Sequence, residues 1–501
     1  EIGVRLVGSE MCIRDSNMPT HSTNPIAIAQ TIDGAPIFLD AGMLNRHLLI
    51  TGATGTGKSV TLQSLAERLS NNGIAVFLSD IKGDLSGLAK AAHPHEKFLA
   101  NLKKRHIKMP EPGANAVYFW DVFQKEGIAL RATISDLGPI LLSRLLKLND
   151  TQASILQLVF RIADEKGLLL IDVKDLKKML AFVQDNLKTF KEEYGQIHAT
   201  SLQTIARNVL NLEDFGADLF FGEPALNIAD LFQTDENGRG IIHILESVKL
   251  IQTPIFYGTV LLWLLSNLYE NLPEVGDLKQ PKMVFFFDEA HLLFKNAPNV
   301  LLEKVEQVVR LIRSKGVGVC FVTQNPADIP DAVAGQLGNR IQHALRAFTP
   351  KDQKAVKVAA QSLRANPKMN TETVIGELKT GEALVSTLNS EGEPQMVERA
   401  FILPPSSFLG ALTANERQVV LDGIPIFKHY GNYFDRESAY EKLSRGDFAA
   451  DDFADSPKPA AKVSRAGRAS KSFLDSALQS FGRTLGRALV RGILGSLTRK
   501  K

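Results

Sequence analysis

A glycine-rich stretch near the start of the chain, "GATGTGKS" (Gly52–Ser59), carries the residue types that hold phosphate. Glycines let the backbone curl so that successive N–H groups point at one spot, and a following helix start adds partial positive charge. In loops with the spacing G-x-x-x-x-G-K-[ST], the lysine reaches the β and γ phosphates and the hydroxyl binds Mg²⁺. We therefore predict a site for ATP and Mg²⁺. The residues expected to contact the nucleotide or metal are Gly52, Thr54, Gly55, Thr56, Gly57, Lys58, Ser59 and Val60, with Lys58 on phosphate and Ser59 on Mg²⁺.

Two adjacent acids form a second chemical feature, at the end of "VFFFDE" (284–289). Three phenylalanines indicate a buried strand, and a carboxylate is costly to bury unless positive charge meets it. A nucleotide hydrolase of this kind needs a strand next to the phosphate-loop strand, ending in an acid that holds Mg²⁺. We assign Asp288 to the Mg²⁺ shell and Glu289 to orienting and deprotonating the attacking water. The alternative is a surface acid pair without a catalytic role.

A polar residue and a set of arginines complete the candidate site. Gln324 follows the apolar run "VGVCFVT" and is expected to sense the γ phosphate or the catalytic water; the alternative is a simple strand cap. Charge developing on the γ phosphate needs a further cation, often an arginine of a neighbouring subunit. Arg313 is the first choice, with Arg310 and Arg340 behind it, and ordinary surface salt bridges are the alternative. An arginine acting between subunits implies a closed ring.

The elements that must position these residues have the pattern of an α/β fold. Apolar runs at 47–51 and 73–80 predict buried strands, and apolar spacing over Lys58–Asn71 predicts the helix between them. Such a βαβ unit implies a mostly parallel sheet with helices on both faces. Further strands are predicted at 116–120, 128–134, 240–245, 282–288, 316–323, 343–348 and 382–387, with a long helix at about 255–271.

The same patterns divide the chain into segments. Residues 1–17 resemble translated sequencing-adapter sequence, so Met18 is the expected start. The expected organisation is an N-terminal hairpin (18–46), a first part of the ATPase core (47–137), a mainly helical insertion (138–239), a second part of the core (240–446), a disordered linker (447–471) and a basic amphipathic helix (472–501).

Composition excludes several classes of protein. The chain has 501 residues, a net charge of +3 and 44% hydrophobic residues, and its apolar runs are shorter than a membrane span. Its two cysteines, Cys12 and Cys320, provide neither a disulfide framework nor a metal cluster. We expect a cytoplasmic protein without integral membrane association.

Four blocks together resemble a known family: "ITGATGTGKSVTLQSLAERL", "DIKGDLSGL", "FFFDEAHLLF" and "TQNPADIPDAVAGQLGNRIQHALRAFTPKDQKAV". They are similar to the HerA-like branch of the HerA/FtsK P-loop ATPases, and more narrowly to the bacterial YjgR group. The resemblance implies a RecA-like core, hexameric rings and ATP-driven DNA translocation. It assigns Lys58, Ser59, Asp288, Glu289 and Gln324 the roles given above, with Arg313 or Arg340 as the arginine finger. HerA proteins that process DNA ends carry an N-terminal β-barrel, whereas about thirty residues separate Met18 from the first core strand, so a nuclease partner is not expected.

Three functions remain open from the sequence. The first is a hexameric motor that moves DNA, for which Lys82 and the run "KKRHIK" (103–108) could supply pore cations. The second is an ATPase that remodels or gates a protein partner. The third function is a kinase. It is the least favoured, because Glu289, directly after the predicted Mg²⁺ ligand Asp288, suits activation of water and not transfer of phosphate to another acceptor. The C-terminal helix could dock within the ring, on DNA phosphates or on an anionic membrane surface.

Overall fold

The computed structural model describes residues 25–276, 278–295, 297 and 299–446. These residues form two compact units, which we call the sheet unit (25–147 and 212–434) and the helical unit (148–211 and 435–446). The predictions for 1–17, for residues 18–24 of the hairpin segment, for the linker and for the C-terminal helix lie outside the described residues. Among the described helices, none is both long and apolar enough to span a bilayer.

The sheet unit is built on one mixed sheet of twelve strands, in the order β2-β1-β12-β11-β10-β3-β9-β8-β4-β7-β5-β6. The strands are β1 (Pro25–Thr31), β2 (Pro36–Asp40), β3 (Leu48–Thr51), β4 (Ala75–Asp80), β5 (Val117–Asp121), β6 (Ile128–Ala129), β7 (Ile242–Glu246), β8 (Met283–Phe287), β9 (Val317–Thr323), β10 (Asn339–Gln342), β11 (Glu382–Ser386) and β12 (Glu398–Ile402). From β10 to β6 all neighbours are parallel, and from β10 to β2 all are antiparallel.

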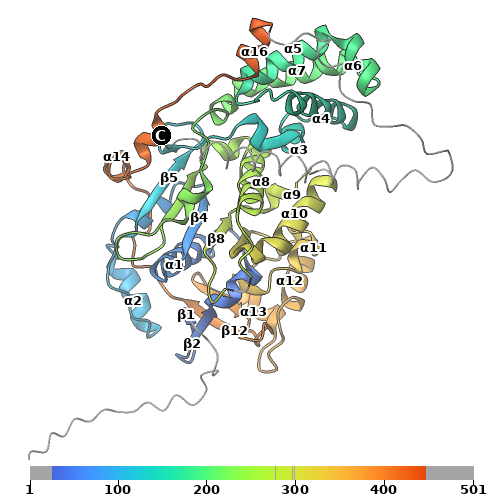
Figure 1. Cartoon of the computed structure of the whole chain (residues 1–501). Helices are drawn as coiled ribbons and strands as arrows, with labels where there is room; N and C mark the ends of the chain where they lie inside the picture. Colours follow the sequence, from blue (N-terminus) through green and yellow to red (C-terminus); the bar gives the residue numbers. More distant parts are fainter. Residues whose placement is uncertain (1–24, 277, 296, 298, 447–501) are drawn as a thin grey trace, which may run out of the picture. The chain divides into compact units, whose positions relative to one another are not determined.

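The longer helices cover the two faces of this sheet, with α1 on one side and α8 and α10 on the other (Figure 1). The helices of the sheet unit are α1 (Lys58–Asn71), α2 (Glu96–Lys104), α3 (Ile134–Leu145), α8 (Pro254–Asn271), α9 (His291–Phe294), α10 (Asn299–Leu311), α11 (Asp331–Ala334), α12 (Pro350–Gln361), α13 (Thr371–Glu377), α14 (Ala414–Asp422) and α15 (Phe427–Gly431). Short 3₁₀ turns lie at Ala41–Arg46, Leu85–Ala89, Ala217–Phe220, Ile228–Phe232, Leu250–Gln252, Ile312–Lys315 and Pro326–Asp328.

The central strands are mostly apolar because both of their faces are buried. Every residue of β3, β4, β8 and β9 is buried, so these strands are continuous apolar runs and not alternating ones. Phe285 packs in parallel on Phe77 of β4, with ring centroids 4.7 Å apart, and Phe287 lies 5.2 Å from Phe321 of β9. The phenylalanines that precede the acid pair therefore fix β8 between its two neighbours.

The predicted α/β class and mostly parallel sheet are confirmed, but three local predictions are wrong. The acid-bearing strand β8 is not the neighbour of β3, because β9 pairs with both and separates them. Residues 343–348 are not a strand, since β10 ends at Gln342 and the chain then turns beneath the loop that follows β3. Of the strand predicted at 128–134, only Ile128–Ala129 forms a strand; Ala132 makes an isolated bridge to Phe221, and Thr133 already caps α3.

The helical unit contains α4 (Asp150–Glu165), α5 (Val173–Asp185), α6 (Leu187–Tyr194), α7 (Ala199–Asp214, in its greater part) and α16 (Ala439–Arg445). Its first segment lies inside the insertion expected at 138–239, and α16 joins it from the far end of the chain. The buried carboxylate of Asp175 explains this pairing, since it accepts hydrogen bonds from Ser438 and from the Tyr440 N–H, at 2.8 Å for the latter.

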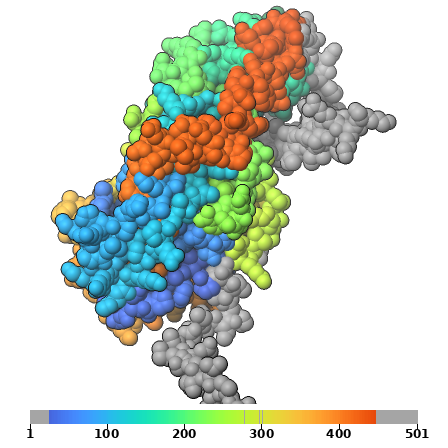
Figure 2. All heavy atoms as spheres, turned by 90° about the vertical axis from the view of Figure 1, so that its left-hand side faces the viewer, coloured from blue at the N-terminus to red at the C-terminus, as the bar shows by residue number. Residues whose placement is uncertain are grey.

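A strap formed by residues 403–417 fastens α1 within the sheet unit. The buried carboxylate of Glu67 accepts from the Ser406 N–H at 2.8 Å and from the Ser407 N–H and hydroxyl at 3.0 and 2.9 Å. In Figure 2 the orange segment that includes α14 lies on the blue and cyan surface, where Lys90 pairs with Glu416 at 2.6 Å. The strap therefore holds the helix that begins at Lys58.

Replacing Glu67 with Ala is expected to destabilise the protein by about 2–4 kcal/mol, because the buried N–H groups of the strap lose their acceptor. Urea unfolding of the full chain measures this change. Glu96→Ala on the exposed face of α2 is the matched control, expected within about 0.5 kcal/mol of wild type. Equal midpoints for the two variants would contradict a fastening role for Glu67.

Candidate nucleotide-binding site

The loop between β3 and α1 is shaped by three glycines with positive φ. Gly52, Gly55 and Gly57 have φ of 153°, 77° and 112°. The close approach at Gly52 leaves no room for a side chain, since a Cβ there would lie 2.5 Å from the His343 Cβ. The loop therefore takes a curled path that other residue types would strain, and α1 starts directly at Lys58.

The ammonium of Lys58 lies folded over this curl. Its Nζ donates to the Gly52 carbonyl at 2.7 Å and to the Ala53 carbonyl at 3.1 Å. Burial lowers the pKa of Lys58, while the carboxylates of Glu289 and Asp288 act in the opposite direction. The loop, the lysine and both acids thus share one electrostatic site, and an incoming phosphate would replace the carbonyls as partner of the ammonium.

A segment that follows β10 supports the loop from below. His343 donates its backbone N–H to Thr51 at 2.7 Å, and Ala53 donates to the Ala344 carbonyl at 2.8 Å. The buried imidazole of His343 lies between the Thr61 hydroxyl at 2.8 Å and the Glu382 carbonyl at 3.0 Å. The sequence does not reveal this role, because residue 343 lies nearly three hundred positions from the loop and its apolar context predicts the start of a strand.

Asp288 and Glu289 occupy the turn after β8. Burial, together with the neighbouring charge of Glu289, raises the pKa of Asp288 to about 7. Such a carboxyl gains from a divalent cation, which would favour its ionised form. Glu289 has a φ of 47°, a backbone conformation that is uncommon outside glycine. This turn allows two consecutive acids to face the same site, as predicted from the strand end.

Gln324 links the acid pair to the loop. Its side-chain Nε2 donates to Glu289 Oε1 at 2.9 Å, and its Oε1 accepts from the Thr54 hydroxyl at 3.3 Å. Because β9 lies between β3 and β8, the residue that follows it spans the gap between their ends. The simple strand-cap alternative does not describe these contacts, since both ends of the amide are used on the candidate site.

His291 is a second partner of Glu289, and the sequence analysis gave it no role. Its Nδ1 lies 3.2 Å from Glu289 Oε2, and the contact raises the pKa of His291. Burial opposes ionisation of Glu289, but His291, Gln324 and the Lys58 charge outweigh it and lower the pKa of Glu289. The carboxylate is thus held on both oxygens. The only sequence signal was the position of His291 two residues after the acid, on the same turn.

Lys82, considered above as a pore cation, lies within the candidate site. Its Nζ is 3.5 Å from the Ser59 hydroxyl. The oxygens placed for Mg²⁺ are therefore the Ser59 hydroxyl and the Asp288 carboxylate, with Lys82 beside both. No cluster of three or more His, Cys, Asp or Glu side chains able to hold a metal occurs among the described residues.

The candidate arginines lie at the opposite edge of the sheet. Arg310 and Arg313 line a cavity of about 560 Å³ together with Arg46, His47 and Gly338. His47 precedes β3 and Gly338 precedes β10, so the cavity is at the amino ends of these parallel strands, whereas the phosphate loop is at the carboxyl end. Arg46 had not been singled out by its sequence context.

Arg340 does not line this cavity. Its guanidinium donates to the Ala334 carbonyl at 3.1 Å, and its residue pairs in register with Leu49 of β3. Burial lowers the pKa of Arg340. The side chain thus has a structural partner within its own chain, and it is a weaker candidate for a finger than the exposed Arg310 and Arg313.

A family model described as "Helicase HerA-like C-terminal" matches residues 26–501. The chain belongs to this HerA-like family. It is 25% identical over 363 residues to the DNA double-strand break repair helicase HerA of Sulfolobus acidocaldarius, covering 68% of this chain and 62% of that protein. The HerA of Sulfurisphaera tokodaii is 24% identical over 362 residues, with the same coverage. The chain thus spans less than two thirds of the length of the curated HerA relatives it matches.

Solved structures share the fold of this chain. The plasmid coupling protein TrwB in complex with the non-hydrolysable ATP analogue ADPNP is similar at a TM-score of 0.52, with 17% identity over 78% of this HerA-like chain and 92% of TrwB. Its complex with the GTP analogue GDPNP gives a TM-score of 0.52 at 16% identity, covering 77% and 91%. The sheet unit therefore has the RecA-like ATPase fold, which confirms the predicted fold class.

The buried imidazole under the loop predicts a pH dependence of stability. Burial lowers the pKa of His343 from 6.5 to about 4, so its contribution to stability is complete above 6.5 and is lost as pH falls toward 4. His343→Asn should therefore reduce the slope of unfolding free energy against pH by about 1.4 kcal/mol per pH unit between these values. Urea titrations at a series of pH values measure the slope. The exposed His93→Asn is the control, and identical slopes for His343→Asn and wild type would contradict the burial of a neutral imidazole.

Proposed function

We propose that this HerA-like chain hydrolyses ATP with Mg²⁺ and acts as a hexameric ring motor that moves DNA, and that it belongs to the YjgR group within the family. The observation that supports the ATPase most strongly is the continuous contact from Thr54 through Gln324 to Glu289 and His291. It joins a phosphate loop to a held carboxylate, which is what a reaction between a phosphoryl group and water requires.

Each side chain has a distinct task in this reaction. The loop N–H groups and Lys58 would bind the phosphates, and Ser59 and Asp288 would hold Mg²⁺, which when bound would neutralise phosphate charge. Glu289 orients the attacking water and accepts its proton, and the hydrogen bond from Gln324 together with the close contact to His291 keeps the carboxylate in place. Gln324 touches both the loop and Glu289, so it is placed to respond to a γ phosphate.

The remaining cation comes from a neighbouring subunit in this proposal. Arg310, Arg313 and Arg46 surround one cavity at the sheet edge opposite the loop. A head-to-tail contact between two copies brings one edge against the other, and repeated contacts of this kind close into a ring. Arg313 is the preferred finger, Arg310 and Arg46 share its cavity, and Arg340 is the last candidate because of its internal hydrogen bond.

DNA is the proposed substrate because the curated relatives are DNA repair helicases by name. The alternative, remodelling of a protein partner, uses the same ATPase site and differs only in what stimulates it. A kinase is the least favoured function, since a carboxylate held for water would compete with transfer to another acceptor.

A DNA motor predicts stimulation of ATP turnover by DNA. Hydrolysis by the full chain should rise at least severalfold with double- or single-stranded DNA, and DNA binding should weaken steeply between 50 and 200 mM salt because phosphate contacts release counterions. Steady-state phosphate release, on protein whose oligomeric state has been measured by mass, tests this. Turnover that no DNA form stimulates would favour the protein-partner alternative.

Two variants separate binding from chemistry in the same assay. Glu289→Gln should retain ATP binding and lower turnover by about 10²–10⁴, the usual contribution of a general base. Lys58→Ala should lose binding as well, because the phosphates lose their ammonium partner. Unchanged turnover in Glu289→Gln would overturn the water-activation role.

If the arginine finger comes from a neighbouring subunit, two inactive variants should regain ATP turnover when their subunits are mixed. Glu289→Gln and Arg313→Ala should each be inactive alone. In a random mixture of subunits, about one quarter of the interfaces would join an intact Glu289 to an intact Arg313, so activity should return to about that fraction of wild type. Phosphate release from co-refolded or exchanged subunits measures it. Arg340→Ala is the control and should be active without mixing, whereas mixed rings without recovered activity would contradict a trans finger.

A further inference from the structure

The turn after β4 is built around one buried carboxylate. Asp80 accepts from the Lys82 N–H at 3.2 Å and the Gly83 N–H at 2.7 Å through Oδ1, and from the Leu85 N–H at 2.9 Å through Oδ2. Gly83 has a φ of 78°, which lets the chain reverse within the turn. Backbone groups thus fix the place at which residue 82 leaves the sheet.

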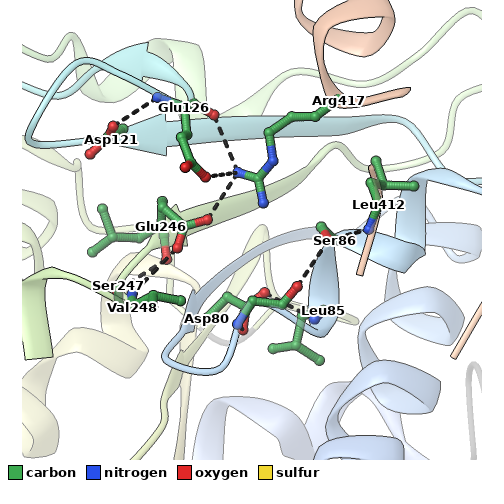
Figure 3. Close-up of polar contacts among 12 residues, drawn as sticks. Asp80, Leu85, Ser86, Asp121, Glu126, Glu246, Ser247, Val248, Leu412 and Arg417 are labelled. Carbon is green, nitrogen blue, oxygen red and sulfur yellow. Dashed lines mark hydrogen bonds and ion pairs between the residues drawn. The ribbon is translucent and has the colours of Figure 1, made fainter. Parts of the chain in front are cut away.

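Neighbouring segments fasten the same turn from outside. Ser86 donates to the Gly83 carbonyl at 3.1 Å and accepts from the Leu412 N–H of the strap at 3.0 Å. Figure 3 shows Asp80, Ser86 and Leu412 side by side, with Arg417 of the strap reaching the Glu246 carboxylate at 2.9 Å. The turn is therefore held at its base and along its flank, while the side chain of Lys82 is exposed.

The exposed ammonium of Lys82 points at the nucleotide site. Its Nζ lies 3.5 Å from the Ser59 hydroxyl, and its charge acts on both Asp288 and Lys58. The positive charge of Lys82 favours the ionised form of Asp288. Toward Lys58 it is repulsive, and it adds to burial in lowering the pKa of that lysine.

Lys58 and Lys82 both reach the place where a phosphate group would bind, beside Ser59 and the acid pair. A triphosphate supplies several negative charges at that position, and each charge-assisted hydrogen bond to it contributes more than a neutral one. The fixed turn also removes part of the entropy cost of holding a lysine at a phosphate. By contrast, a pore cation would gain nothing from lying beside Ser59 and Asp288.

We propose that Lys82 is a second phosphate-binding lysine of this site, which contacts the terminal phosphates of the bound nucleotide beside the Mg²⁺ position. The proposal rests on the proposed ATPase function and names a residue that the phosphate-loop pattern does not contain. The ammonium of Lys82 lies next to the oxygens placed for the metal. With nucleotide bound, phosphate oxygens become its partners.

The test is equilibrium binding of a fluorescent, non-hydrolysable ATP analogue with Mg²⁺ to the full chain, without DNA. Lys82→Gln should raise the Kd by about tenfold to a hundredfold, the range for losing a hydrogen bond to a charged group. Lys82→Arg retains the charge and should stay within about fivefold of wild type. Lys97→Gln, which removes an exposed lysine from α2, is the matched control and should bind as wild type does.

The outcomes separate this proposal from the function on which it rests. If wild type binds the analogue and Lys82→Gln binds it within about twofold, Lys82 is not a phosphate ligand, while the ATPase site stands. If Lys82→Gln binds nucleotide normally but loses DNA affinity, the lysine serves the pore and the proposal is also overturned. If wild type and Lys97→Gln bind no nucleotide, the ATPase function itself fails.

Discussion

The pairing of β9 with both β3 and β8 is the constraint on which the candidate site depends. It places the carboxyl ends of three parallel strands side by side, in the order loop, glutamine, acid pair. Gln324 can therefore touch Thr54 on one side and Glu289 on the other. If β8 paired directly with β3, the acid pair would lie closer to the loop, and the Gln324 side chain could not lie between them.

Buried polar groups in the surrounding structure hold the phosphate loop in position. The loop cannot support itself by apolar packing, because its backbone N–H groups must stay available for an anion. His343 and Ala344 support it from below through hydrogen bonds, and Glu67 anchors the following helix to the strap. Each of these groups would be costly if its partner were lost, so the phosphate loop is held by a rigid polar frame rather than by the loop sequence alone.

The two edges of the sheet carry complementary chemistry. The carboxyl edge gathers Lys58, Lys82 and the acids around the loop, and the amino edge gathers Arg46, Arg310 and Arg313 around a cavity. Parallel strands make this separation possible, since all their ends of one kind meet at one edge. In the proposed ring, head-to-tail assembly would bring the arginines at the amino edge of one copy to the phosphate loop of the next.

The sequence by itself determined the parts of the site that are local. The phosphate loop, α1 and the strand that ends in Asp288 follow from short-range spacing and burial, and these elements lie where they were predicted to within about two residues. Glycine spacing and three consecutive phenylalanines are physical requirements of a curled loop and a doubly buried strand, so they can be read without a partner. The α/β class follows from the same runs.

Only the tertiary structure decided which residues meet. The order of the strands, the support from His343 and the position of Lys82 beside Ser59 depend on contacts between residues distant in the chain. The burial pattern of β3, β8 and β9 is the same on every strand, so it carries no information on which of them are neighbours. Strand order is decided by the packing of helices and loops around the whole sheet, and it is this order that brings a glutamine, a histidine and a second lysine to the site.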